Sequence, residues 1–97
     1  MRENNQQIKL ENNTYLVIEN TNNCLNFDEL KEKYTDYFEA FDYILGDYAY
    51  NKLRLKGFCD EKNKKLNKIN NIKIKDKYLK EQCAYKCNYF LIKKINS

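Results

Sequence analysis

The chain is 97 residues long, with 42% hydrophobic residues, 14% aromatic residues and a formal net charge of +4. This length makes one domain, and this apolar content predicts a folded globule rather than a disordered or fibrous chain. No apolar run exceeds four residues, as in Tyr89 to Ile92, so we expect no membrane-spanning segment. The polar N-terminus lacks the apolar core of a signal peptide. We therefore expect a cytoplasmic protein.

Several catalytic chemistries are excluded by residue types that the chain lacks. It has no histidine, and its only serine is the last residue, Ser97. An imidazole base and a serine nucleophile are therefore excluded. The two glycines, Gly46 and Gly57, are eleven residues apart, which is too far for a glycine-rich phosphate loop. We expect no catalytic residue and no cofactor.

The four cysteines favour free thiols over a metal site or a disulfide. Cys83 and Cys87 are separated by three residues, whereas tetrahedral zinc sites use pairs at shorter spacing that recur elsewhere. Cys24 and Cys59 would each have to supply one ligand from a distant loop. Free thiols are the usual state in a reducing compartment, so no metal site is predicted.

Charge is divided unevenly along the chain. Residues 1–50 carry 4 Lys and Arg against 10 Asp and Glu, and residues 51–97 carry 14 against 4. The two halves therefore have net charges of −6 and +10. This asymmetry favours either a basic face toward a polyanion or attraction between the halves. An ordinary solvated surface, rich in lysine, is the alternative.

The first half predicts a strand and a helix behind a flexible segment. Residues 1–12 are predicted to be flexible, although 8–10 can open a short strand. Residues 14–19 are β-branched and aromatic, which predicts a strand. A helix is expected to begin after Asn26, which is a typical capping residue. Apolar residues then recur at helical spacing, so the helix should end at about residues 38–40.

The second half predicts a strand–turn–strand unit, a loop, a helix and a final strand. Residues 43–45 enter the first strand, and the alternation of leucines with cations predicts the second over 52–56. A mobile loop follows over 60–71, where apolar residues are sparse. Helical propensity marks 76–83. Residues 87–95 predict a central strand, because the middle of this segment is apolar on both faces.

These elements predict a single α+β domain over residues 13–96, with a mostly antiparallel sheet and two helices. Their order is strand, helix, strand, strand, helix, strand. A ferredoxin-like split βαβ sandwich has this order, and so do RNA-recognition modules. Oligomeric state does not follow from any of these patterns.

The candidate binding site lies at the turn and on the second strand of the predicted strand–turn–strand unit. Alternation places three cations on one face of that strand and the leucines on the other. Two tyrosines lie in the preceding turn, where they could stack on bases while the cations contact phosphates. The alternative is a strand face that meets only solvent. The candidate residues are Tyr48, Tyr50, Lys52, Arg54 and Lys56.

Two blocks of the sequence carry a family resemblance. They are Phe41–Phe58 (FDYILGDYAYNKLRLKGF) and Tyr78–Lys94 (YLKEQCAYKCNYFLIKK), with two cysteines in the second. Both resemble the YutD-like family of small proteins from low-GC Gram-positive bacteria, and the resemblance covers about residues 14–95. Family members have Trp-Gly where this chain has Tyr48-Ala49, and glycine where it has Asn51. The resemblance implies a small cytosolic protein and transfers no catalytic or ligand residue.

Three functions fit these observations. The first is a non-enzymatic module that binds RNA or a ribonucleoprotein through the basic strand and the tyrosine-rich turn. The second is a protein-interaction module or regulatory adaptor that docks through the acidic first helix or the same turn. The third is a small enzyme that uses Asp47 and Arg54 around a pocket.

Overall fold

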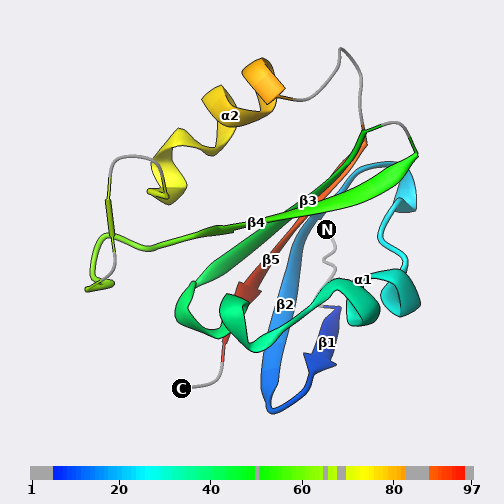
Figure 1. Ribbon diagram of the computed structural model, residues 1–97, viewed down its shortest axis with the longest axis horizontal. Coiled ribbons are helices and arrows are strands. Elements are labelled where there is room, and N and C mark those ends of the chain that lie inside the picture. Colours follow the sequence, from blue (N-terminus) through cyan, green and yellow to red (C-terminus); the bar gives the residue numbers. More distant parts are fainter. Residues whose placement is uncertain (1–5, 50, 65, 68–69, 83–87, 96–97) are drawn as a thin grey trace.

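The computed structural model describes residues 6–49, 51–64, 66–67, 70–82 and 88–95. Its centre is a five-stranded antiparallel sheet with the spatial order β1-β2-β5-β3-β4 (Figure 1). The strands are β1 (Gln7–Leu10), β2 (Asn13–Asn20), β3 (Tyr43–Ala49), β4 (Lys52–Phe58) and β5 (Tyr89–Lys94). The helices are α1 (Phe27–Lys33) and α2 (Lys75–Gln82), with 3-10 turns η1 (Thr21–Asn23), η2 (Asp36–Ala40) and η3 (Ile72–Ile74). The predicted α+β class is confirmed.

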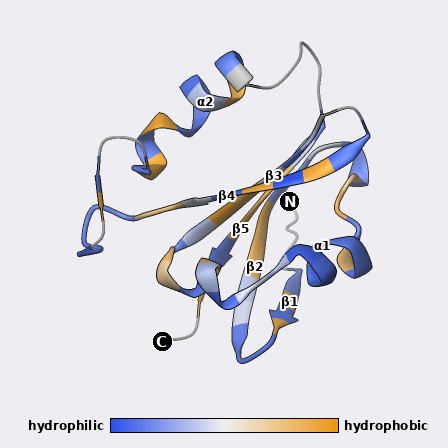
Figure 2. Ribbon diagram, in the orientation of Figure 1, coloured by the Kyte–Doolittle hydropathy of each residue, from blue (hydrophilic) through white to orange (hydrophobic). Residues whose placement is uncertain are grey.

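Helical elements cover both faces of the sheet. α1 and η2 lie on one face, and η3 and α2 lie on the other (Figure 1). The larger core lies under α1, where Leu30 packs against Ile44, Phe90 and Ile92. The smaller core lies under α2 and is built on Leu45, Phe58 and Leu91. The most hydrophobic colouring accordingly follows the central strands (Figure 2).

The strand order differs from the ferredoxin-like order that the sequence predicts. In a ferredoxin-like sheet the last strand lies at an edge and both helices cover one face. Here β5 lies between β2 and β3, and one helix covers each face. The reason is the burial of β5 on both sides, with Phe90 and Ile92 toward α1 and Leu91 toward α2. A strand that is apolar on both faces belongs inside the sheet, as predicted for 87–95.

Two boundaries in the first half differ from the predicted ones. Residues 7–10 form β1, with Leu10 buried in the core, instead of belonging to a flexible segment over 1–12. The predicted long helix is divided, because α1 ends at Lys33 and η2 follows as a separate turn. The expected cap is present: the backbone N–H of Glu29 donates to Asn26 Oδ1 at 3.1 Å.

Each glycine provides room for a phenylalanine ring. A Cβ on Gly46 would lie 2.1 Å from Cζ of Phe90, and a Cβ on Gly57 would lie 2.3 Å from Cγ of Phe41. Both glycines lie within strands, at β3 and β4, and neither has a positive φ. The close ring contact, rather than turn geometry, therefore accounts for glycine at both positions.

Asn51, in the connection between β3 and β4, adopts the left-handed backbone region with φ 64°. Asparagine tolerates this region, whereas a β-branched residue does not. We expect Asn51→Val to lower the free energy of unfolding by about 1–2 kcal/mol, and Asn51→Gly to stay within about 0.5 kcal/mol of the original chain. Urea unfolding of the three chains measures both effects. Equal midpoints for valine and glycine would contradict the strain argument.

Candidate functional site: the edge strand β4 and an aromatic hollow

The predicted cations do share one face of β4, but Arg54 is held by a buried carboxylate. Its Nε donates to Asp47 Oδ1 at 3.1 Å and its Nη2 donates to Asp47 Oδ2 at 2.7 Å. The two residues lie directly opposite each other on β3 and β4. The Asp47 side chain is only 2% exposed and that of Arg54 is 40% exposed. Arg54 therefore neutralises a buried charge, which is a structural role.

The other two cations of β4 differ in their surroundings. The Nζ of Lys56 lies 5.3 Å from the ring centroid of Phe58 and 5.6 Å from that of Tyr78. The aliphatic part of the Lys56 side chain thus covers aromatic surface, while its ammonium group interacts with the faces of these two rings. Lys52, at the start of the strand, is exposed to solvent. The face of β4 that was predicted to be open is partly covered by α2.

Tyr48 points to the opposite face from these cations. β3 continues to Ala49, so alternation turns Asp47 toward α2 and Tyr48 toward α1. The Tyr48 hydroxyl donates to the carbonyl oxygen of Cys24 at 2.9 Å. Burial, with a contribution from the Glu29 carboxylate, raises the pKa of Tyr48 to about 12. Tyr48 and the β4 cations therefore lie on opposite faces of the sheet, and Tyr50 lies outside the described residues.

The environment of Tyr48 predicts a loss of stability at alkaline pH. The hydroxyl pKa of Tyr48 is raised from 10.0 to about 12 in the folded chain, so the unfolded chain releases this proton first. The stabilisation is therefore complete below pH of about 10 and is lost as pH rises toward about 12. Tyr48→Phe should keep a larger fraction of its neutral-pH stability at pH of about 11 than the original chain. Urea unfolding at both pH values, with tyrosine ionisation followed by ultraviolet absorbance, tests this; identical pH profiles would contradict it.

An aromatic hollow of about 370 Å³ lies around the outer edge of β4. Its size is in the range of ordinary ligand sites. The η2 turn and the residue after it supply three rings, α2 supplies a fourth, and two asparagines come from the segment after β4. The described residues that line it are Tyr37, Phe38, Phe41, Leu55, Lys56, Gly57, Asn67, Asn70 and Tyr78. We call this site the aromatic hollow.

Tyr37 is the most accessible ring of the aromatic hollow. Its side chain is 64% exposed. It packs edge-on against Phe38 with ring centroids 5.0 Å apart, and it lies 5.3 Å from the ring of Phe41. Phe41 in turn rests on Gly57 of β4. The exposed ring is therefore held in place by a ring stack on the sheet, as expected of a binding surface.

The far end of β4 already pairs with an extended segment of its own chain. The backbone N–H of Cys59 donates to the carbonyl of Asn70 at 2.6 Å, and that of Ile72 donates to Cys59 at 3.0 Å. Cys59 and Asn71 thus form a parallel bridge. Further anchors reach the predicted mobile loop over 60–71, because Asn63 Nδ2 donates to Asp42 Oδ2 at 3.0 Å.

This bridge shows which backbone groups of β4 face outward. Both backbone groups of Cys59 point away from β3, toward Asn70 and Ile72. Backbone groups of alternate strand residues point the same way. The N–H and C=O groups of Gly57, Leu55 and Leu53 are therefore directed outward as well. Among the residues that the structure describes, β4 is the last strand on its side of the sheet, and such an edge can accept another strand.

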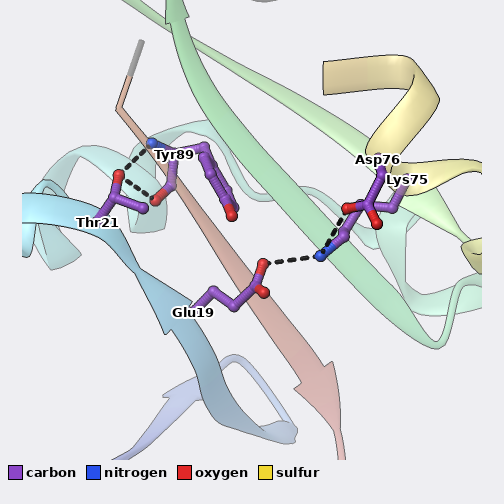
Figure 3. A network of polar contacts seen from close by, with 5 residues as sticks. All are labelled: Glu19, Thr21, Lys75, Asp76 and Tyr89. Atoms are coloured by element: carbon purple, nitrogen blue, oxygen red, sulfur yellow. Dashed lines mark hydrogen bonds and ion pairs between the residues drawn. The ribbon is translucent and has the colours of Figure 1, made fainter. Parts of the chain in front are cut away.

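A polar network joins α2 to β2, on the face of the sheet opposite α1 (Figure 3). Lys75 Nζ lies 2.9 Å from Glu19 Oε1 of β2 and 3.4 Å from Asp76 Oδ1. Burial lowers the pKa of Lys75, but these partners offset the effect and the net pKa is raised. In the same network, Thr21 Oγ1 accepts from the backbone N–H of Tyr89 at 2.8 Å. α2 is thus positioned to hold Tyr78 at the aromatic hollow.

The described residues offer little support for catalysis or metal binding. Asp47 and Arg54, the residues named for the enzyme hypothesis, do not line the aromatic hollow. Within the described ranges, no three Cys, Asp or Glu side chains are grouped to hold a metal ion. Cys83 and Cys87 lie outside the described residues. No helix in the described part of the chain is long and apolar enough to cross a bilayer.

Sequence patterns did not indicate the aromatic hollow. Helical spacing predicts one long helix through Tyr37 and Phe38, and Tyr78 falls in a second predicted helix; neither pattern shows what the rings contact. One signal was available: Tyr37 and Phe41 are four residues apart and immediately precede the strand pair that contains both glycines. Glycine inside a strand marks a close approach by another group, and these rings supply it at Gly57.

Comparisons with known proteins agree with the family resemblance. A family model described as "Putative antitoxin YutD-like" matches residues 9–93. The chain is 36% identical over 88 residues to "Putative antitoxin YutD" of Bacillus subtilis (strain 168), covering 91% of this chain and 97% of that protein. The solution NMR structure of protein YutD from B. subtilis is similar with a TM-score of 0.79 and 33% identity, covering 100% of this chain and 88% of that chain. The chain therefore belongs to the YutD-like family.

Proposed function

We propose that this chain is a non-enzymatic protein-binding module that docks its partner at the outer edge of β4 and in the aromatic hollow. The observation that carries the proposal is the coincidence of the two features. Outward backbone groups at Leu55 and Gly57 lie beside a half-open hollow that contains the exposed ring of Tyr37. Strand addition supplies affinity through backbone hydrogen bonds, and an adjoining pocket supplies specificity.

The family description supports a protein partner, because an antitoxin acts by countering a toxin. The surroundings of the cations also favour protein over RNA. Arg54 is committed to Asp47, which leaves only two of the three cations of β4 for a polyanion. The sheet carries helical elements on both faces, whereas RNA-recognition modules bind bases on an open sheet face. RNA binding is therefore the less favoured function.

Affinity capture with a site variant tests this proposal. Immobilised original chain, Tyr37→Ala and Phe27→Ala are incubated with nuclease-treated lysate. Phe27 is the matched control, since it is another exposed aromatic residue, 38% exposed at the start of α1. We expect a protein that the original chain and Phe27→Ala retain and that Tyr37→Ala loses. Circular dichroism confirms that all three chains are folded.

Two outcomes would contradict the proposal. Retention of the same proteins by all three chains would show that the aromatic hollow does not bind them. If the original chain retains proteins from untreated lysate and none of them from nuclease-treated lysate, the basic surface would be assigned to RNA instead.

A further inference from the structure

The outer edge of β4 presents two chemically different faces to an added strand. Lys52, Arg54 and Lys56 lie on the α2 side, while Leu53 and Leu55 lie on the α1 side. An added strand alternates its own side chains between the same two faces. The Cβ atom of each of its residues would lie about 4.5–5.5 Å from the Cβ atom of the opposite β4 residue on the same face. The edge is therefore suited to a strand whose side chains alternate between two chemical types, and it does not select for one side chain alone.

The charges on this edge disfavour a second copy of the chain as the occupant. Two β4 strands joined edge to edge in antiparallel orientation would set cation opposite cation in every register that keeps the outward backbone groups paired. With Arg54 opposite Arg54, Lys52 of each copy would face Lys56 of the other. Directly opposed like charges destabilise strand pairs, and edge lysines protect sheets from such association. Asp47 neutralises Arg54 in each copy. The repulsion between the copies therefore comes from Lys52 of one copy facing Lys56 of the other.

We propose that this edge binds an extended segment of a partner protein in which acidic and apolar residues alternate. The proposal rests on the proposed function and specifies its partner. Carboxylates of the segment would lie on the side of Lys52 and Lys56. Its apolar residues would lie on the side of Leu55, where one of them enters the aromatic hollow beneath Tyr37.

The structure contains a precedent for this mode at the same edge. Residues 70–72 run alongside β4 and exchange two backbone hydrogen bonds with Cys59. The next outward positions toward the start of β4 are Gly57 and Leu55, and both line the aromatic hollow. An incoming segment would thus bind next to an existing strand contact. The opposite sheet edge, β1, has four residues, and short edge strands are poor templates for strand addition.

Short labelled peptides test the proposed chemistry directly. The probes are a peptide that alternates valine and glutamate, a block peptide with the same composition, a peptide that alternates valine and lysine, and oligouridylate. We expect the valine–glutamate peptide to bind at least about tenfold tighter than each of the others by fluorescence anisotropy. Equal binding of the block peptide would mean attraction by charge alone and would overturn the proposal. Tighter binding of oligouridylate, or no binding of the alternating acidic peptide, would overturn it too.

A charge-reversal pair locates the interaction. Lys52→Glu should weaken binding of the valine–glutamate peptide at least about fivefold and strengthen binding of the valine–lysine peptide, because opposite charges attract across a strand pair. Lys80→Glu is the matched control, since Lys80 is an exposed lysine of α2 outside the edge. Equal effects of the two substitutions would overturn the proposal. If Tyr37→Ala still abolishes capture of a protein while no acidic peptide is selected, the proposed function stands and the alternating-segment inference fails.

Discussion

Gly46→Ala is expected to lower the free energy of unfolding by about 3 kcal/mol, at the upper end of the cost of overpacking a core. The added methyl group would lie 2.1 Å from Cζ of Phe90 and 2.5 Å and 2.6 Å from its Cε atoms. Gly46 and Phe90 are direct partners in the pairing of β3 with β5, and Phe90 is fully buried. Neither the ring nor the backbone has room to move aside, because interiors are closely packed.

A double-mutant cycle checks the cause of this loss. Phe90→Leu alone should destabilise the chain, since it removes part of a buried ring. In the Gly46→Ala, Phe90→Leu double mutant, the clash is relieved and the loss should be smaller than the sum of the single losses. Gly57→Ala is the comparison, because its clash is with Phe41, which is only partly buried and can shift. Urea unfolding measures the four variants and the original chain. Full additivity of Gly46→Ala and Phe90→Leu would contradict the ring contact.

Arg54→Met is expected to cost about 2–3 kcal/mol of stability, because it leaves the buried Asp47 carboxylate without its charged partner. This figure is below the full cost of breaking a buried pair, since the Arg54 side chain is 40% exposed and solvent screens part of the interaction. The loss should be measured by urea unfolding near neutral pH, where Asp47→Leu combined with Arg54→Met should recover most of it.

Lys52→Met is the matched control for Arg54→Met. Both changes remove a cation from the same face of β4, but Lys52 is exposed and its loss should stay within about 0.5 kcal/mol. Equal losses for the two variants would show that the Asp47–Arg54 pair contributes nothing beyond an ordinary surface charge. In that case Arg54 would again be available as a ligand-binding cation.

The class of fold followed from local patterns, whereas the order of the strands did not. Alternation and capping depend on neighbouring residues, so the strand over 14–19 and the cap at Asn26 could be predicted. Strand order depends on which surfaces must be covered. The two-sided apolar pattern of 87–95 already excluded an edge position for β5, and it was in conflict with the ferredoxin-like order.

The candidate site was predicted only in part, for a specific reason. The sequence pattern favours Gly46 and Asp47 as turn formers, which ends the first predicted strand too early. In the structure both are strand residues: Gly46 makes room for Phe90, and Asp47 binds Arg54. Tyr48 therefore faces α1, away from the cations. The aromatic hollow joins four segments that are distant in sequence, and no local pattern contains such a contact.

Amide hydrogen exchange of the outer edge of β4 is the most direct measurement of the docking site. The control is β1, the opposite edge of the sheet. The backbone N–H of Val17 on β2 donates to the carbonyl of Gln6, so the backbone groups of Gln6 face β2. By alternation the N–H of Lys9 on β1 points outward. On binding the protein captured through Tyr37, exchange at Leu55 and Gly57 should slow at least about tenfold, with no change at Lys9. Unchanged exchange at Leu55 and Gly57, or slowing at Lys9 instead, would contradict docking at β4.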